Sequence, residues 1–379
     1  MIIFIESNTS GSGKKFLEYC NKFKLQYFFL TKNPNKYGWK NDFNYLKCNT
    51  NNYSEIYKIC SNLIKNYKIK IIFSTSDSFI SIAYKLSRIF NLNKNNYNFL
   101  YKCRSKFKLL NLLKKNKFVK RKFGKLNLKK KIFNKTIIIK PNSGTGSKNI
   151  YKIKSGIKLE KEKLSLLENN DFYIFEEFIK GQEYSLEVFI YNKRIIYKQL
   201  IKKETNANFV ETGHFASKKI DNFKQKQQNK LLRYLQNLKL DTCFLHIELK
   251  FIKNNIEIIE INPRLCGGNI SDLIQISTNL DLIKIFLNLI KNESFSKIKL
   301  NKEFNGSEYK IQYLIPNANK RIKKIHINKS KKILETKIYR DKLMNYSYIK
   351  NNFEDRIGHI IFKNKNNYKI NKDYKFIYK

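Results

Sequence analysis

Two glutamates and an asparagine near the middle of the chain have the spacing of a metal-binding group. Residues 246–268 read HIELKFIKNNIEIIEINPRLCGG, in which two apolar runs flank the polar cluster Lys253–Asn255, a pattern typical of a β-hairpin. If the chain turns at this cluster, Glu248 lies opposite Glu260. Asn262 then points to the same face, because strand side chains alternate between the two faces of a sheet.

This arrangement predicts a cation on one face of the hairpin. Like charges directly opposite each other across two strands are destabilising. Mg²⁺ takes oxygen ligands of this kind, usually together with substrate phosphates. Arg264, just beyond the second strand, would lie near the same face. An ordinary amphipathic hairpin with its acidic face in water has the same spacing, so the hairpin alone leaves both interpretations open.

A lysine before a glycine-rich loop forms a second candidate site. The apolar segment Thr136–Lys140 runs into PNSGTGSKNIYKI, where glycine and serine lie between two β-like segments. Glycine allows the backbone to approach a ligand closely, so N–H groups of such a loop can cover phosphates. Lys140 would reach the same phosphates. A flexible β-turn is the alternative interpretation of the glycines.

The elements before these motifs predict a parallel α/β domain over residues 1–100. Apolar runs at Met1–Glu6, Gln26–Thr31 and Ile69–Ser74 alternate with helical segments, an order typical of a parallel sheet. The loop Ser7–Gly13 fits neither standard phosphate-binding glycine motif, so it predicts a tight turn or a substrate contact. The predicted helices are Lys14–Phe23, Ser54–Lys68 and Phe79–Phe90.

The remaining segments surround the two candidate sites. A polar loop over residues 206–219 contains His214, and a tail from Leu300 is basic and rich in β-forming residues. Apolar residues recur every three or four positions in the last predicted helix, as on one face of a helix. The predicted elements are a basic helix over 101–120, a strand over Phe172–Phe178, and helices over Asp221–Leu238 and Ser271–Lys291.

The charge of the chain is extreme, but its distribution argues against a dedicated nucleic-acid-binding protein. The formal net charge is +47, from 77 Lys and Arg against 30 Asp and Glu. Such a charge usually indicates nucleic acid. Here lysine is spread along the whole length and accompanied by Asn, Ile, Tyr and Phe, as in an A/T-biased coding sequence. We expect no specific nucleic-acid partner, only salt-sensitive binding to polyanions.

Cysteine spacing and hydropathy predict a cytoplasmic protein. The six cysteines form no CxxC pair, so neither a disulfide framework nor a zinc site is expected. No uninterrupted apolar run reaches the roughly 18–20 residues of a membrane helix. The N-terminus has no basic region before an apolar one, so no signal peptide is predicted.

In this order the motifs resemble those of the ATP-grasp superfamily. The motifs are IIIKPNSGTGSKNI, IFEEFIKGQEYSLE and IIEINPRLCGGNISDLI, and the resemblance covers about residues 1–300. Within the superfamily, FIESNTSGSG and NPRLCGGNISDLI look most like carboxylate–amine ligases such as the L-amino-acid (dipeptide) ligases. The implied fold class is α/β, with an α+β catalytic core. The implied domains are a Rossmann-like domain at 1–100, an ATP-grasp domain at 101–300 (nucleotide flap 136–152, metal hairpin 244–264) and a small β-rich domain at 301–379.

Position by position, the resemblance implies a role for each matching residue. The nucleotide-binding residues would be Lys106 and Lys140, the flap residues Gly144, Thr145, Gly146 and Ser147, the adenine-pairing strand with Glu176, Phe178 and Ile179, and Glu183 for the ribose. The Mg²⁺ ligands would be Glu248, Glu260 and Asn262, and the catalytic cations would be Arg264 and Lys140. Substrate-pocket residues would be Glu187, His214, Gly267 and Gly268.

The implied activity is ATP- and Mg²⁺-dependent amide formation through an acyl phosphate, with release of ADP and phosphate. Mn²⁺ is an alternative metal, and the partners would be a small carboxylate and an amine, both expected to be amino acids. A homodimer is one assembly that the resemblance allows. Two alternatives stay open: another ATP-grasp enzyme, carbamoyl-phosphate synthase-like or biotin carboxylase-like, and a nucleic-acid-binding protein on a retired ATP-grasp fold. The group that deprotonates the amine is not identified.

Overall fold

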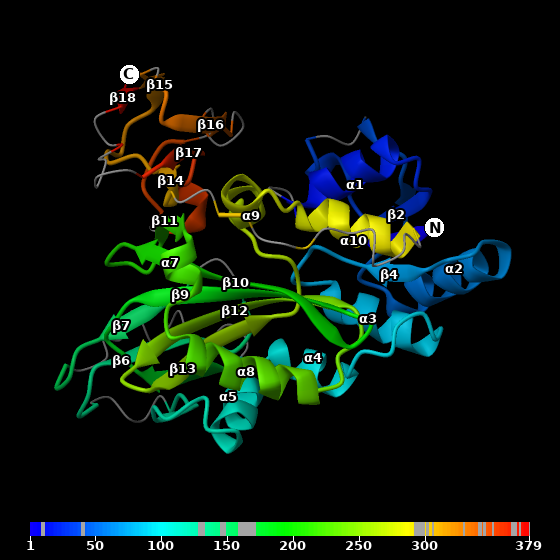
Figure 1. The fold of residues 1–379 in the computed structure, drawn as a ribbon, viewed down its shortest axis with the longest axis horizontal. Coiled ribbons are helices and arrows are strands. Elements are labelled where there is room, and N and C mark those ends of the chain that lie inside the picture. The colour runs from blue at the N-terminus through cyan, green and yellow to red at the C-terminus, as the bar shows by residue number, and fades with distance from the viewer. Residues whose placement is uncertain are drawn as a thin grey trace.

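The computed structural model describes most of the 379 residues. The described residues are 1–8, 12–38, 42–127, 133–144, 149–157, 172–291, 300, 303–304, 307–328, 330–339, 343, 346–350, 352–364, 370 and 373–378. They form a parallel α/β unit, a small antiparallel sheet and a long antiparallel sheet (Figure 1).

The N-terminal unit is the predicted parallel α/β arrangement. Its four strands have the order β3-β2-β1-β4, and β1 pairs in parallel with both β2 and β4. Asn52 begins one helix by accepting a hydrogen bond from the backbone N–H of Glu55, as capping residues do. The elements are β1 Ile2–Ile5, α1 Ser12–Lys22, β2 Tyr27–Thr31, β3 Leu46–Lys47, α2 Tyr53–Asn66, β4 Ile71–Phe73 and α3 Ile80–Ile89.

A small antiparallel sheet carries the glycine-rich loop. Its strand order is β5-β8-β6-β7, with β5 Phe123–Lys125, β6 Ile137–Pro141, β7 Tyr151–Ile153 and β8 Tyr173–Glu177. The single basic helix predicted over 101–120 is wrong: the segment holds α4 Tyr97–Cys103 and α5 Lys106–Lys115. The break falls at Ser105, whose hydroxyl caps α5 by accepting from the N–H of Lys108. Serine favours such caps over helix interiors.

The long antiparallel sheet joins the middle of the chain to the C-terminal tail. Its order is β13-β12-β9-β10-β11-β14-β17-β16, so strands from the tail extend the sheet that carries the acidic hairpin. Strands β15 Ile322–Ile327 and β18 Tyr374–Tyr378 pair separately. The sheet strands are β9 Glu183–Tyr191, β10 Arg194–Thr205, β11 Glu211–Ala216, β12 Cys243–Ile252, β13 Asn255–Asn262, β14 Tyr309–Leu314, β16 Ile333–Ile338 and β17 Gly358–Lys363.

Two further predictions differ from the structure. The polar loop over residues 206–219 contains strand β11, in which His214 is buried between β10 and β14. Pairing on both sides satisfies the backbone of this polar segment, a long-range effect that composition does not show. The helix predicted over Ser271–Lys291 is two helices, α9 Ile270–Thr278 and α10 Leu282–Lys291. Asn279, with a left-handed φ of 57°, ends the first one.

The predicted helix over Asp221–Leu238 corresponds to α8 Gln225–Asn237, and the short helix α7 Lys218–Asp221 precedes it. Within the described ranges, no single helix has the length and hydrophobicity to cross a membrane. Only α9 and α10 taken together meet that test, and they are bent by 90°.

An aromatic cluster joins the N-terminal unit to the long sheet. Helix α10 lies beside α1 (Figure 1), and its Phe286 is fully buried between the two units. The Phe286 ring centroid lies 5.0 Å from that of Phe73 in β4 and 5.5 Å from that of Phe244 in β12. Aromatic pairs in this distance range add packing energy beyond the buried area. Phe286 therefore fixes the position of the parallel sheet relative to the acidic hairpin.

We predict that Phe286→Ala lowers the free energy of unfolding by about 3–5 kcal/mol, because it leaves a cavity between the two units. Urea denaturation followed by intrinsic fluorescence measures the loss. The control is Leu334→Ala, since Leu334 is 43% exposed and should change stability by about 0.5 kcal/mol or less. Equal losses for both variants would contradict the role assigned to Phe286.

Candidate functional site

The acidic hairpin has the predicted register. In the pairing of β12 with β13, Glu248 is directly opposite Glu260 and His246 is opposite Asn262. The turn is at Lys253, which has a positive φ of 53°, and Asn254. A β-bulge follows Glu248, so the alternation that places both carboxylates on one face ends there.

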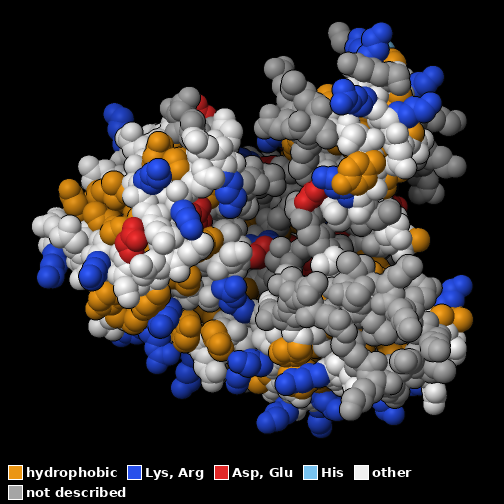
Figure 2. Space-filling model, turned by 180° about the vertical axis from the view of Figure 1, so that it is seen from behind, with side chains coloured by type: hydrophobic (Ala, Val, Ile, Leu, Met, Phe, Trp, Pro, Cys, Tyr) orange, Lys and Arg blue, Asp and Glu red, His pale blue; other side chains and the backbone are white. Residues whose placement is uncertain are grey.

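The hairpin lines a pocket between the two antiparallel sheets. The pocket has a volume of about 350 Å³, within the range of roughly 300–1,000 Å³ that is typical of small-molecule sites. Figure 2 shows a hollow in the surface, with acidic side chains inside it and Lys and Arg side chains predominating on the surface around it. The predicted site residues that line it are Lys106, Lys140, Gly144, Glu176, Phe178, Ile179, Glu183, Glu248, Glu260, Asn262, Arg264, Gly267 and Gly268.

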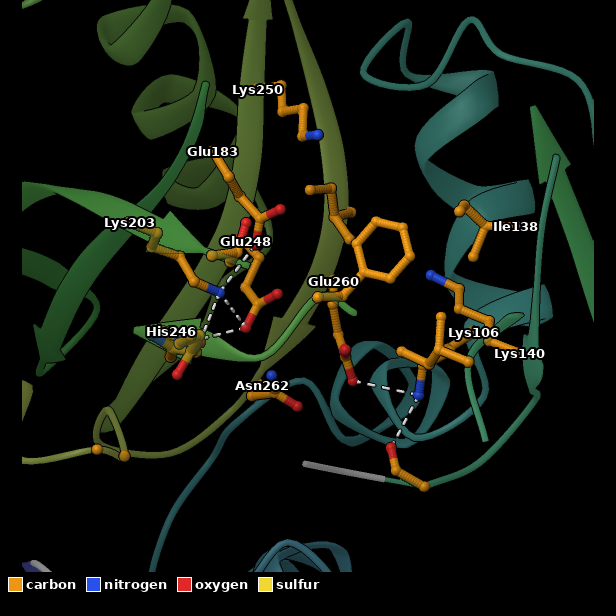
Figure 3. A pocket seen from close by; sticks show the side chains of 18 of the residues that line it. Lys106, Ile138, Lys140, Glu183, Lys203, His246, Glu248, Lys250, Glu260 and Asn262 are labelled. Atoms are coloured by element: carbon orange, nitrogen blue, oxygen red, sulfur yellow. Dashed lines mark hydrogen bonds and ion pairs between the residues drawn. The ribbon is translucent and has the colours of Figure 1, made fainter. Parts of the chain in front are cut away.

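Lys203 neutralises three carboxylates on one side of the pocket (Figure 3). Its Nζ lies 2.9 Å from Glu183, 2.8 Å from Glu211 and 3.0 Å from Glu248. Burial lowers the pKa of an ammonium group, but the three carboxylates outweigh burial and hold the pKa of Lys203 well above its ordinary value. Lys203 is therefore a permanent cation at the centre of this acidic group.

His246 is a second cation beside Glu248. Its Nδ1 lies 2.7 Å from Glu187 and its Nε2 lies 3.3 Å from Glu248. Burial alone lowers the pKa of an imidazole, but the two carboxylates outweigh it and raise the pKa of His246 to about 10. Burial likewise opposes ionisation of Glu248, yet Lys203 and His246 hold the pKa of Glu248 well below its usual range.

Lys106 joins the acidic hairpin to the glycine-rich loop. Its Nζ lies 3.4 Å from Oε1 of Glu260 and donates to the carbonyl oxygen of Gly144 at 2.9 Å. The two opposed carboxylates thus have separate cations, Lys203 and His246 for Glu248, and Lys106 for Glu260. The cation expected between them from the sequence is in part supplied by the protein itself.

The oxygen donors of the hairpin still fit a divalent metal. Among the described residues, the contacts of Glu248 and Glu260 engage Oε1 of each carboxylate and leave Oε2 to other ligands. In that part of the chain, no group of three or more His, Cys, Asp or Glu could hold a metal alone. Two carboxylates and the amide of Asn262 would suit Mg²⁺ that also binds phosphates, rather than a metal enclosed by protein ligands.

Glu176 belongs to a buried ion-pair network. It lies 2.6 Å from Nζ of Lys140 and accepts from Nε of Arg121 at 2.6 Å, and Arg121 also pairs with Glu257 on the hairpin at 3.1 Å. Burial raises the pKa of a carboxyl group, but Lys140 and Arg121 outweigh burial and keep the pKa of Glu176 below its ordinary value. The network fixes the small sheet to the hairpin. Because Lys140 and Arg121 occupy the Glu176 side chain, Glu176 can meet the base of a nucleotide only through its backbone groups.

One end of the pocket is apolar and the other is ionic. Ile138, Ile150, Phe178 and Ile259 line the apolar end, where Lys250 donates to the Ile179 carbonyl at 3.0 Å. Burial lowers the pKa of Lys250 there.

At the ionic end, Arg264 pairs with Asp77 of the N-terminal unit, and Arg356 lies 2.8 Å from Glu211. Burial lowers the pKa of a guanidinium, but Asp77 outweighs burial and raises the pKa of Arg264. The tyrosine hydroxyl of Tyr313 donates to the Gly268 carbonyl at this end.

Two predicted substrate residues lie behind the pocket wall. Glu187 is buried and bonded to His246, and His214 is fully buried with its ring centroid 5.6 Å from that of Tyr313. The flap residues Thr145, Gly146 and Ser147 lie outside the described residues. The functional roles of all the predicted site residues stay predictions.

Several lining residues were not predicted from the sequence: Asp77, Arg121, Lys203, Glu211, His246 and Arg356. His246 could have been found, because it is two residues before Glu248 and so shares its face. Lys203 and Glu211 require the pairing of β10 with β11, which the polar composition of residues 206–210 conceals. Arg356 gave no local signal, because it reaches the pocket from the distant tail.

Comparison with known proteins agrees with this geometry. Residues 133–272, which include strands β6, β7 and β8 of the small sheet and the acidic hairpin, match the family model described as the ATP-grasp domain. Over these residues the chain is similar to ATP-grasp proteins. No curated protein sequence matches the chain.

Solved structures show that the ATP-grasp fold extends over the whole chain. An L-amino acid ligase from Bacillus licheniformis has a TM-score of 0.78 at 14% identity, covering 100% of this chain and 98% of the ligase. Phosphoribosylglycinamide synthetase from Anaerococcus prevotii has a TM-score of 0.70 at 17% identity, covering 100% and 99%. The biotin carboxylase domain of Hydrogenobacter thermophilus 2-oxoglutarate carboxylase has a TM-score of 0.67 at 11% identity, covering 96% of this chain and 86% of that domain's chain. The predicted fold class is therefore confirmed.

We predict that Glu176→Gln in the ATP-grasp domain lowers the free energy of unfolding at pH 7 by about 3–5 kcal/mol, because Lys140 and Arg121 lose their buried partner. The folded-state pKa of Glu176 lies below its ordinary value of 4.5. The ionised Glu176 side chain therefore contributes to the free energy of unfolding above pH 4.5, and this contribution is lost as pH falls through the folded-state pKa. The deficit of the variant should shrink in acid.

Urea denaturation at pH 7 and again in acid, below the folded-state pKa of Glu176, measures this change. Glu354→Gln is the control, since its pair with Lys350 is at the surface and contributes about 1 kcal/mol or less. A deficit that stays constant or grows in acid would show that the carboxylate of Glu176 is not ionised in the fold.

Proposed function

We propose that this protein is an ATP- and Mg²⁺-dependent carboxylate–amine ligase that forms an amide bond through an acyl phosphate. The observation that carries the proposal is one continuous pocket with three parts. An apolar slot is followed by two lysines and two opposed carboxylates, and then by two arginines paired with acids. These parts suit, in order, a base, a chain of phosphates with a metal, and charged substrates.

The nucleotide would lie along the small sheet. Ile138, Phe178 and Ile259 would enclose the base, and the backbone of residues 176–179, at the end of β8, would pair with its edge. Lys140 and Lys106 would bind the phosphates, since both ammonium groups reach the pocket beside the glycine-rich loop. Glu183 would meet the ribose. Glu248, Glu260 and Asn262 would hold Mg²⁺, or Mn²⁺ in its place, which when bound neutralises phosphate charge and orients the phosphoryl group.

The ionic end suits the two other substrates. Arg264 and Arg356 would bind and orient a carboxylate, while Glu211 and Asp77 would attract an amine. A carboxylate oxygen attacks the γ-phosphorus of ATP and ADP leaves. The amine then attacks the acyl carbon, phosphate leaves, and the amine nitrogen gives up a proton.

In phosphoryl transfer the protein contributes mainly by positioning the reactants and stabilising their charge. Lys140 and Arg264 would stabilise the charge on the phosphoryl group, each such preorganised donor contributing about 3 kcal/mol.

The solved structures support this choice within the fold. The L-amino acid ligase gives a higher TM-score, 0.78, than the biotin carboxylase domain, 0.67. The structure of that carboxylase domain holds MgADP, which supports a magnesium-nucleotide site in this fold. A carboxylase-like activity, which would use bicarbonate, remains the second candidate because the same fold serves it.

We predict that Glu260→Gln reduces Mg²⁺-dependent ADP release by at least about 100-fold, because it removes one of the two opposed carboxylates from the proposed metal site. A coupled assay for ADP in the presence of a carboxylate and an amine measures the rate. Glu335→Gln, outside the pocket, should retain the wild-type rate. Turnover by Glu260→Gln near the wild-type rate would show that the metal assignment is wrong.

The substrate class can be tested separately. We expect ADP release to rise when pairs of amino acids are supplied, and mass spectrometry should detect a product with the mass of the two substrates less one water. ADP release that needs bicarbonate and no amine would instead support the carboxylase-like candidate.

A further inference from the structure

We propose that His246 is a positioning residue that, anchored by Glu187, orients the carboxylate of Glu248 for metal binding. This inference rests on the proposed function, because it concerns the metal that the ligase would use. It adds a buried side chain of the hairpin to the three predicted metal ligands.

The sheet places His246 at the centre of the proposed ligands. Strand β12 lies between β9 and β13, so His246 has Glu187 as its neighbour on one side and Asn262 on the other. Two residues along, on the same face, Glu248 lies between Ser185 and Glu260. The imidazole is therefore a neighbour of Glu248 and Asn262 on the same face of the sheet, and Glu260 is diagonally across from it.

Both ring nitrogens of His246 are engaged by carboxylates. Nδ1 lies 2.7 Å from Oε1 of Glu187, and Nε2 lies 3.3 Å from Oε1 of Glu248. His246 and Glu187 are 4% and 3% exposed, so neither side chain has room to rotate into water. Since the two nitrogens point in opposite directions from the ring, the position of Glu187 determines where Nε2 meets Glu248.

This contact selects the orientation of Glu248. His246 and Lys203 both reach Oε1, at 3.3 and 3.0 Å, and this leaves Oε2 as the atom for a metal (Figure 3). A carboxylate held in this way loses little rotational freedom when the metal binds. Partners that orient a metal ligand from behind typically change metal affinity by about 10–100-fold when they are removed.

His246 is not proposed as a metal ligand or as a catalytic residue. Its nitrogens already meet two carboxylates, and Mg²⁺ prefers oxygen donors. Its effect on the reaction would pass through Glu248 alone. A change at His246 should therefore alter metal binding and leave metal-free nucleotide binding unchanged.

The test is a titration of the full-length protein with Mn²⁺ in the presence of ADP, followed by the loss of the free Mn²⁺ signal in electron paramagnetic resonance. His246→Leu removes both contacts, and we expect the Kd of Mn²⁺ to rise about 10–100-fold. His246→Gln can still donate to Glu248, and its Kd should stay within about threefold of wild type. Calorimetry should give each variant the wild-type affinity for ADP without metal.

The matched control is His359→Leu. His359 is also fully buried and also pairs with a glutamate, Glu335, at 3.0 Å, but it lies outside the pocket. Loss of a buried histidine should lower the thermal stability of both leucine variants, and only His246→Leu should weaken Mn²⁺ binding. If His246→Leu does not fold, Glu187→Gln replaces it, with an expected rise in Kd of about 10-fold.

The inference is overturned if the folded His246→Leu protein binds Mn²⁺ as wild type does, if His359→Leu weakens binding equally, or if the glutamine variant is as weak as the leucine one. Wild-type protein that binds no Mn²⁺ with ADP would overturn the proposed function itself. The two failures are therefore distinguishable.

Discussion

The pocket depends on the neutralisation of acidic side chains that the sheet forces together. Glu183, Glu211 and Glu248 come from three strands and point to one buried cation, Lys203. Without that cation, three carboxylates would lie in a poorly hydrated cleft, where unpaired charge costs several kcal/mol per group. Lys203 makes it possible for β9, β11 and β12 to present acids on one face of the same sheet.

The same rule holds around the whole pocket. Each carboxylate discussed above has a cation within 4 Å: Lys106 for Glu260, His246 for Glu187, Lys140 and Arg121 for Glu176, and Arg356 for Glu211. Lysine and arginine from the small sheet, the long sheet and the tail therefore converge on the acids. Binding of a metal nucleotide would replace these partners with phosphate and metal. Folding has already removed the charged side chains from water, so much of the free-energy cost of desolvating them does not arise when the nucleotide binds.

The parts of the site that could be predicted are those with a local signal. The register of Glu248 with Glu260 follows from one turn and a two-residue period, and the parallel sheet follows from alternating runs. The order of three motifs was enough to predict the ATP-grasp fold. Lys203 and His214 could not be placed, because β11 looks like a polar loop until its pairing with β10 and β14 is known. Ser105 begins a helix and Asn279 ends one, each inside a segment that apolar periodicity alone predicts as a single helix.

The continuity of the long sheet has a consequence for how the protein is made. Arg356 contacts Glu211 across 145 residues of sequence, and β14, β17 and β16 extend the sheet that begins at the acidic hairpin. Contacts of such separation form late, because a long loop must close before they can be made. During synthesis, the edge of β11 stays unpaired until the tail has left the ribosome. Over that interval the nascent chain has an open strand edge that other chains could join, and the pocket is incomplete.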